Sequence, residues 1–336
     1  MKASFMATAT YYGPAPSIED WPAPPRACDR QIASRSINLS LRNAHRAEEL
    51  GFDWVSVSEH HYSPYLLTPN PIVLGGALSQ VLRHATIALL GPLVPLCNPV
   101  RLAEEIALLD SISGGRVVAL LLRGTKHEQD VYDQIADNAK EMTREGIDLV
   151  LKAWTTPDPF SWEGKHYQFK TVSVWPRPIQ EPHPPVFASG NSDDSTLFAA
   201  RRGLGLAMSF LTPGKVKRTV DLYREEAANT GWTPTPEHVI YRGLVDIKSV
   251  RCEETPHERA DKAEALHGVP PPMLLNDPFF QGRPQDILRQ IGSLREAGVG
   301  VIDLNISKAA FSVDYDEQAA NLNVFAREVL PEIRSW

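Results

Sequence analysis

Short, almost continuous apolar runs recur along the chain, and between them apolar residues return every three or four positions. Continuous runs are typical of strands buried on both faces of a parallel sheet, and the longer period is typical of amphipathic helices. The runs predict eight strands, at residues 2–10, 52–58, 86–94, 116–122, 185–189, 204–210, 239–247 and 299–306. The intervening stretches predict helices that include residues 40–50, 100–111, 140–154, 195–202, 215–230 and 284–297.

Two of the predicted helices have a clear end in the sequence. In "AEELGFD" and "LREAGVG" a glycine, Gly51 or Gly298, follows the last apolar turn, where a left-handed cap is needed. Strands that alternate with helices predict the α/β class, and eight such units predict a (β/α)8 TIM barrel. We therefore expect a single domain over residues 1–336, with a doubly wound sheet as the alternative.

Three stretches exceed what a minimal barrel needs, and we interpret them as insertions at the carboxyl-terminal face of the barrel. Residues 11–37 are rich in Pro and Trp and are expected to wrap this face after the first strand. Residues 155–184 include "FSWEGKHYQFK", a hairpin pattern with Glu163 and Gly164 at its turn. Residues 248–282 are charged early and Pro-rich later, as a lid over a barrel mouth is.

Composition narrows the class of protein. The net charge of −7 and pI of about 5.8 give no basic footprint for nucleic acid, and no apolar run is long enough to predict a membrane span. The first residues lack the pattern of a secretory signal. The three cysteines, Cys28, Cys97 and Cys252, are scattered, which indicates reduced thiols in a cytoplasmic protein rather than a disulfide framework or a structural zinc site.

The predicted strand at residues 52–58 runs directly into "EHHY", which places a carboxylate and two imidazoles at its carboxyl end. Active sites of (β/α)8 barrels lie at this face, and an imidazole can act as acid or base near neutral pH. Adjacent strand residues point to opposite sides, so His60 and His61 should not bind one metal ion together. One should face the barrel mouth while the other packs outside. A hydrogen-bonded structural pair is the alternative.

Two further strand ends carry groups that suit an anionic ligand. In "LLLRGT" the strand at 116–122 ends at Arg123, whose guanidinium suits a phosphate or a carbonyl, or else a salt bridge to a nearby loop. In "ASGNSDDSTLF" a strand leads through Gly190 into the start of a helix. Free amides there suit a phosphate, but Asp193 and Asp194 favour simple helix capping.

Proline and aromatic residues mark the remaining loops at this face. "LLGPLVPLCNPV" has three prolines around a strand end, which indicates either an unusual peptide geometry or only a rigid exit loop. Aromatic side chains in the two loops near this face either line an apolar pocket or pack the loops down. These aromatics are Tyr11, Tyr12, Trp21, Tyr62 and Tyr65.

Together these segments resemble the bacterial luciferase-like flavin-dependent monooxygenase family. The strongest match is "NPVRLAEEIALLDSISGGRVVALLLRGT", supported by "AEELGFDWVSVSEHHY" and "ASGNSDDSTLFAARRGLGLAMSF" and by "GRPQDILRQIGSLREAGV" near the end. The resemblance covers nearly the whole chain, with the segments in the family's order and at its spacing. It implies a TIM barrel of the luciferase type.

The resemblance also implies roles for individual residues. His60 corresponds to the catalytic histidine near the reactive C4a edge of the flavin, and Leu90–Gly91 to a non-prolyl cis peptide in the third strand. Luciferase has a glutamate at the position of Asn191 and a cysteine at that of Leu122, so a reactive thiol next to Arg123 is not expected here. The implied cofactor-binding residues are Leu90, Gly91, Arg123, Gly190, Asn191, Ser192 and Ser195, and candidates for the substrate pocket are Tyr12, Asn98, Trp175 and Phe210.

The function that the resemblance implies is oxygen transfer. Reduced FMN from a separate flavin reductase would react with O2 to give a flavin C4a-peroxide, which would pass one oxygen atom to an organic substrate. The implied assembly is a homodimer, with no metal ion and no nucleic-acid or membrane partner. A deazaflavin-dependent oxidoreductase and a catalytically silent flavin-binding subunit are the alternatives. The substrate, and whether it undergoes hydroxylation, Baeyer–Villiger insertion or heteroatom oxidation, are not specified by the sequence.

Overall fold

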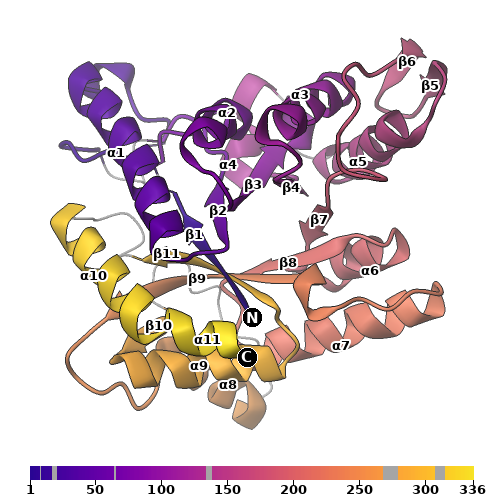
Figure 1. Cartoon of the computed structure of the whole chain (residues 1–336). Helices are drawn as coiled ribbons and strands as arrows, with labels where there is room; N and C mark the ends of the chain where they lie inside the picture. The colour runs from indigo at the N-terminus through magenta and orange to yellow at the C-terminus, as the bar shows by residue number, and fades with distance from the viewer. Residues whose placement is uncertain (8, 17–20, 64–65, 134–137, 268–278, 307–314) are drawn as a thin grey trace.

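The computed structural model describes residues 1–7, 9–16, 21–63, 66–133, 138–267, 279–306 and 315–336. Within these residues, eight parallel strands form a ring in the order β1-β2-β3-β4-β7-β8-β9-β11, and the pairing of β11 with β1 closes it (Figure 1). The predicted (β/α)8 barrel is confirmed. The strands are β1 (Lys2–Met6), β2 (Trp54–Val57), β3 (Thr86–Leu93), β4 (Val117–Leu122), β7 (Val186–Ser189), β8 (Gly205–Ser209), β9 (Val239–Ile247) and β11 (Val301–Ile306).

Helices surround this ring, and most of the predicted ones are present (Figure 1). Helix α2 was not predicted from the sequence, because its residues are apolar on most sides and so lack a helical period. The helices are α1 (Arg30–Glu49), α2 (Pro71–Val81), α3 (Pro99–Ser113), α4 (Lys126–Gln129), α5 (Ala139–Thr155), α6 (Asp193–Arg201), α7 (Pro213–Asn229), α8 (Pro256–His267), α9 (Pro284–Glu296), α10 (Tyr315–Glu328) and α11 (Leu330–Ser335).

The strands separate two apolar regions. The larger one lies between the outer face of the barrel and the helices, and it includes Phe5, Val55 and Ile302. The smaller one fills the barrel from inside, with Trp54 and Val301 among its buried side chains. Successive strand residues point to opposite faces, so residues at even spacing from Trp54 and Val301 also face the interior.

The insertions are partly as predicted. The hairpin is confirmed: β5 (Phe160–Glu163) pairs antiparallel with β6 (Gln168–Val172), and it lies beside α5 on the outside of the barrel (Figure 1). The first insertion is shorter than predicted, because α1 begins at Arg30 with its amides capped by Asp29. The third insertion holds α8 and β10 (Phe280–Gly282), which pairs with β9.

Strand β3 corrects the expectation of a cis peptide at Leu90–Gly91. In the described residues the cis peptide bonds precede Pro22, Pro176 and Pro182, and the Leu90–Gly91 bond is not among them. Gly91 instead has a φ of +142°, and the β3–β4 register shifts between Leu90 and Leu93. Glycine tolerates this φ, and the shift in register indicates a local β-bulge in β3.

Candidate active site at the barrel mouth

His60 lies just beyond the carboxyl end of β2 and forms a pair with a carboxylate from another strand end. Its Nδ1 is 2.7 Å from Oε1 of Glu128 in α4, which follows β4. The backbone N–H of His60 donates to the Thr68 carbonyl at 3.0 Å, which fixes the start of the loop. The imidazole is 31% exposed, whereas the Glu128 side chain is only 6% exposed. The His60 ring is therefore partly exposed, while the carboxylate that holds it is buried.

Glu128 is itself held in place by the first turn of α4. Its Oε2 accepts hydrogen bonds from the backbone N–H and the hydroxyl of Thr125, at 2.9 and 3.0 Å. Burial alone would raise the pKa of Glu128, but the hydrogen bond and charge of His60 and the bonds from Thr125 together hold that pKa below its usual value. A charged carboxylate accepts the Nδ1–H of His60, which leaves Nε2 as the other ring nitrogen for chemistry.

His61 forms a second pair, and this one is closed. Its Nε2 lies 2.9 Å from Oε1 of Glu59, and the two side chains are 4% and 12% exposed. Oε2 of Glu59 also accepts the N–H of Leu93 at 3.2 Å, which ties the end of β2 to the end of β3. The expectation that one histidine would face the mouth and the other would pack away is confirmed. Glu59 orients His61, not His60.

Trp21, from the first insertion, contacts His61 and also His127, the residue before Glu128. Its ring stacks on His127 with centroids 4.9 Å apart, and its Nε1–H donates to the His61 carbonyl at 3.0 Å. Tyr62 packs near the same indole, with ring centroids 5.9 Å apart. Tyr65 lies outside the described residues. The first insertion therefore lies over the ends of β2 and β4, as predicted.

A cavity of about 460 Å³ opens beside His60, between the first insertion and the loop after β2. Its volume falls in the range of small-molecule pockets. Most of the lining is apolar, and His60 is the one imidazole in it among the described residues. The lining residues are Tyr11, Pro16, Ala23, Pro24, Pro25, Ala27, Cys28, Ala33, Ile37, His60, Tyr62, Ser63, Leu66, Leu67 and Pro69.

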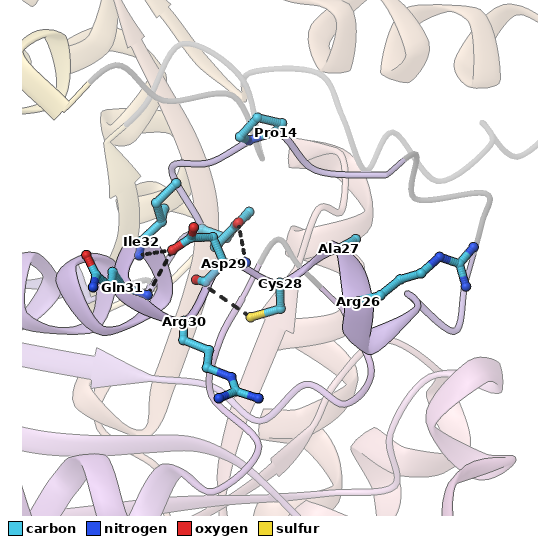
Figure 2. Close-up of a pocket in the computed structure, with 9 residues that line it drawn as sticks. Pro14, Arg26, Ala27, Cys28, Asp29, Arg30, Gln31 and Ile32 are labelled. Atoms are coloured by element: carbon cyan, nitrogen blue, oxygen red, sulfur yellow. Dashed lines mark hydrogen bonds between the residues drawn. The ribbon is translucent and has the colours of Figure 1, made fainter.

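A second hollow, of about 690 Å³, shares Tyr11, Ala27 and Cys28 with this cavity (Figure 2). Its one carboxylate among the described residues is Asp29, whose Oδ1 accepts the N–H groups of Gln31 and Ile32 at 2.9 Å each. This carboxylate is already used to cap α1, so the hollow is explained by the start of the helix.

The predicted phosphate-binding segment lies at the carboxyl end of β7 and the start of α6. Ser192 caps the helix: its hydroxyl accepts the N–H of Ser195 and lies 2.8 Å from that residue's hydroxyl. Asn191 is bound to β8, since its Oδ1 accepts the N–H of Ser209 at 3.0 Å. A Cβ on Gly190 would lie 2.7 Å from Leu206, so the strand end requires glycine for packing.

The sequence indicated that Asp193 and Asp194 would disfavour a bound phosphate, but in the structure both are paired with cations. Asp193 pairs with Lys215 at 3.1 Å, and Asp194 pairs with both Lys140 and Arg144. Their charges are therefore matched by cations on neighbouring helices, and the free amides of the first helical turn keep their positive potential.

Arg123 lies close to this helix start. Leu120 and Phe187 are partners in the β4–β7 register, and Arg123 and Gly190 each follow them by three residues. Arg123 is exposed and has no ion pair with any residue that the structure describes. The alternative of a salt bridge to a loop is thus not observed.

Leu90 and Gly91 lie in β3, and Gly91 lies beside the carboxyl end of β2. A Cβ on Gly91 would lie 3.2 Å from the backbone nitrogen of Glu59 and 3.7 Å from Leu122. Leu90 is buried inside the barrel. The absence of this Cβ allows β3 to approach the end of β2 closely.

Two of the residues predicted for the substrate pocket have structural roles. The Tyr12 hydroxyl lies 3.4 Å from Oε1 of Gln318 in α10, and the Asn98 side chain caps α3 by accepting the N–H of Val100 at 2.9 Å. Neither residue is among those that line the cavity beside His60 in the described chain.

The other two lie at opposite ends of the barrel. Phe210 directly follows β8, with a φ of +56° and its N–H 3.4 Å from the Arg242 carbonyl, so it lies at the mouth. Trp175 is 85% exposed in the connection that leads to the amino end of β7. Nearby, Ile179 donates to Asp110 near the carboxyl end of α3. Trp175 is not among the residues that line the cavity beside His60, and its place in the substrate pocket stays a prediction.

A buried polar cluster inside the barrel was not predicted. Asp303 is fully buried and accepts hydrogen bonds from the Ser4 and Ser56 hydroxyls at 2.6 and 2.7 Å. It also pairs with Nε of Arg242 at 2.8 Å. Nη2 of Arg242 and Oδ1 of Asn305 are buried and have no partner among the described residues. The signal that could have found the cluster is "VIDLNI", where Asp and Asn two residues apart interrupt an apolar strand on one face.

Neither a metal centre nor a membrane helix is found in the part of the chain that the structure describes. No three His, Cys, Asp or Glu side chains there gather closely enough to hold a metal ion, and no helix there has the length and apolar character to cross a bilayer.

Comparison with known proteins gives a consistent picture. The chain is 28% identical over 211 residues to the alkanal monooxygenase alpha chain of the Kryptophanaron alfredi symbiont, which covers 62% of this chain and 57% of that one. It is 26% identical over 192 residues to the oxygenase component of the flavin-dependent trigonelline monooxygenase of Acinetobacter baylyi, which covers 56% and 53%. The matched part thus spans less than two thirds of these relatives.

Solved structures share the fold over almost the entire chain. Monooxygenase RslO1 from Streptomyces bottropensis has a TM-score of 0.76 at 24% identity, with 99% of both chains covered. The oxygenating constituent of 3,6-diketocamphane monooxygenase from Pseudomonas putida, solved with FMN, has a TM-score of 0.71 at 21% identity over 99% and 98%. An F420-dependent secondary alcohol dehydrogenase also has a TM-score of 0.71, at 18% identity over 99% of both chains.

The family model that describes luciferase-like monooxygenases matches residues 23–267, which include the His60–Glu128 pair and the start of α6. This match covers most of the chain, and it agrees with the closed barrel and with the relatives above. The chain belongs to the luciferase-like monooxygenase family.

Proposed function

We propose that the protein is the oxygenase of a two-component flavin-dependent monooxygenase. It binds reduced FMN and O2 and transfers one oxygen atom to an organic substrate, while the other oxygen atom leaves as water. The observation that carries this proposal is the His60–Glu128 pair on the wall of an apolar cavity at the carboxyl-terminal face of the barrel. Membership of the family and an FMN-containing structure of the same fold support it.

The residues at the mouth fit a flavin mononucleotide. A phosphate dianion needs N–H donors and positive charge, and the start of α6 offers its first amides together with Ser192 and Ser195. Arg123 adds a guanidinium with no ion-pair partner in the described chain. Inside the barrel, the unpaired atoms of Arg242 and Asn305 leave hydrogen-bonding capacity for a polar ring. Asn191 holds the loop by its bond to β8.

The chemistry divides between the cofactor and the chain. Reduced FMN, when bound, supplies the electrons that activate O2. His60 holds and moves a proton at Nε2, because Glu128 occupies Nδ1 and fixes the orientation of the ring. The apolar residues beside His60 receive the substrate and exclude water from the site.

The partners follow from the same proposal. The sequence has no G-x-G-x-x-G turn after a strand, so a separate reductase supplies the reduced FMN. The relative from Acinetobacter baylyi, an oxygenase component by name, supports this arrangement. Leu108 and Ile112 lie four residues apart on α3 and are each 50% exposed, so we place a homodimer contact on that face. We place the protein in the cytoplasm, where its thiols stay reduced.

The test is a single-turnover experiment under controlled oxygen. The protein is mixed anaerobically with photoreduced FMN and with a panel of ketones, thioethers and aromatic compounds, and ¹⁸O₂ is then admitted. We expect a product that contains one ¹⁸O atom and forms only after oxygen is admitted.

Two other outcomes identify the alternatives. A product that forms without oxygen from reduced F420 would show a deazaflavin-dependent hydride transfer, which the F420-dependent neighbour makes a specific competitor. Tight binding of reduced FMN with no product from any compound of the panel would favour a catalytically silent subunit.

A further inference from the structure

The interior of the barrel carries a polar layer that the phosphate site and the His60–Glu128 pair do not use. Asp303, Arg242 and Asn305 alternate with outward-facing residues on β11 and β9, so all three face inward. Asp303 accepts hydrogen bonds from Ser4, Ser56 and Nε of Arg242. This layer lies above the apolar side chains that fill the amino-terminal end of the barrel.

Within the described residues, two buried atoms of this layer lack a partner: Nη2 of Arg242, a donor, and Oδ1 of Asn305, an acceptor. An unpaired buried polar atom is costly, so native proteins rarely leave one without protein, water or ligand. Arg242 and Asp303 are register partners, and Asn305 lies two residues nearer the carboxyl end of β11. The two side chains therefore come from adjacent strands, and Asn305 lies nearer to the mouth than Arg242.

The charge of this layer indicates what it can bind. The guanidinium of Arg242 is already neutralised by Asp303 at 2.8 Å, so the layer offers no net positive charge for a second phosphate. A free donor and a free acceptor on adjacent strands suit a neutral group that has a carbonyl oxygen beside an N–H.

We propose that Arg242 and Asn305 bind the carbonyl–NH edge of a neutral ligand inside the barrel. This inference rests on the proposed function, and it deepens it by assigning a second anchor away from the phosphate. The pyrimidine-dione edge of a flavin has this chemistry, with N3–H between two carbonyls, and so does an amide or imide substrate. Nη2 of Arg242 donates to the carbonyl, and Oδ1 of Asn305 accepts from the N–H. A deazaflavin has the same edge, so the inference does not depend on which of the two cofactors binds.

The experiment compares FMN with FMN methylated at N3, which lacks the N–H. Dissociation constants are measured by fluorescence titration for the wild type, for Asn305→Ala and for Arg242→Lys. We expect the wild type to prefer FMN over the methylated form by about tenfold, as one lost hydrogen bond implies. Asn305→Ala should bind FMN about tenfold more weakly and lose this preference. Arg242→Lys should weaken both flavins while the preference remains.

Controls separate binding from folding. Asn229→Ala removes an exposed asparagine at the end of α7 and should leave both dissociation constants within twofold. Arg242→Lys keeps a cation beside the buried Asp303, because the loss of that charge could prevent folding. Asn305→Ala carries the test if the lysine variant fails to fold.

The outcomes show whether the bound edge belongs to a flavin or to a substrate, and whether the inference or the proposed function fails. If both flavins bind the wild type equally but Asn305→Ala raises the KM of an amide or carbonyl substrate, the edge belongs to the substrate. If Asn305→Ala changes neither the flavin preference nor that KM, the layer holds ordered water only and the inference is wrong. A wild-type protein that binds neither FMN nor reduced F420 would instead overturn the proposed function.

Discussion

His60 and His61 are neighbours in the sequence, and each has a glutamate partner, but the two pairs lie in different surroundings. His60 reaches across to Glu128 at the end of β4 and lines an apolar cavity. His61 pairs with Glu59, only two residues away, and is almost fully buried. Adjacent residues beyond a strand point in opposite directions, so one imidazole meets the cavity and the other meets the protein.

The difference teaches how one motif supplies both chemistry and support. The second oxygen of Glu59 also binds the backbone of β3, so the closed pair joins two strand ends. The second oxygen of Glu128 is held by Thr125, so the open pair is fixed from behind while one ring nitrogen stays available. Residue types alone do not distinguish the pairs; their partners and their exposure do.

The largest effect should come from replacing each histidine by alanine. His60→Ala should lower product formation by about 10²- to 10³-fold, the usual worth of a positioned acid or base, and leave FMN affinity within a few-fold. His61→Ala should instead lower the free energy of unfolding by about 3 kcal/mol, because Glu59 would keep a buried charge without its partner. Single-turnover product yield and denaturant unfolding measure the two effects.

His60→Gln and His61→Gln serve as matched controls, since glutamine keeps hydrogen-bonding capacity but cannot exchange a proton near neutral pH. His61→Gln should recover part of the lost stability, whereas His60→Gln should stay as inactive as His60→Ala. Equal losses of activity in both His60 and His61 variants would contradict the division of roles.

A smaller effect is expected when Glu128 loses its charge. Glu128→Gln should lower the rate of product formation about tenfold, since a neutral partner forms a weaker hydrogen bond to the His60 ring. The matching variant Glu59→Gln should change that rate by less than about twofold while lowering stability. A rate loss in Glu59→Gln as large as that in Glu128→Gln would contradict the assignment of catalytic support to Glu128 alone.

The pH dependence of stability sharpens the same comparison. The pKa of Glu128 in the folded protein lies below the ordinary value of 4.5, so its charge stabilises the fold fully above about pH 4.5. This contribution is lost as the pH falls through the folded-state pKa. The stability gap between the wild type and Glu128→Gln should therefore shrink as the pH falls below about 4.5.

Much of the fold could be predicted from the sequence because parallel strands buried on both faces are written as continuous apolar runs. All eight barrel strands lie where these runs lie, although the first ends at Met6 rather than at residue 10. Helix α2 was missed because "PIVLGGALSQV" is apolar on most sides and shows no helical period. The start of α1 was missed for the opposite reason, since "RQIASRSIN" is mainly polar.

The candidate site was predicted in part. His60, Arg123 and the start of α6 are adjacent to strand ends, so a pattern of strands is enough to locate them. Glu128 is 68 residues from His60 in sequence, and only the closure of the barrel brings the two together. The polar layer of Arg242 and Asn305 depends on which strand face is inside, which a continuous apolar run does not reveal.

Two thiols report on the open and closed sides of the site. Cys28 is exposed and lines the cavity beside His60. Cys97 lies on the Glu59 side, where burial, with the negative charges of Glu59 and Glu105, raises its pKa to about 12. In a Cys252→Ser background at pH 8, a thiol reagent should modify Cys28 at least about 10³ times faster than Cys97, because so little thiolate forms on Cys97. The rates are measured by mass spectrometry of the labelled peptides.

A bound apolar substrate should slow the labelling of Cys28 several-fold and leave the labelling of Cys97 unchanged, since only the open side receives the substrate. Fast labelling of Cys97 would show that the Glu59 side opens in solution, and the contrast between the two pairs would then fail.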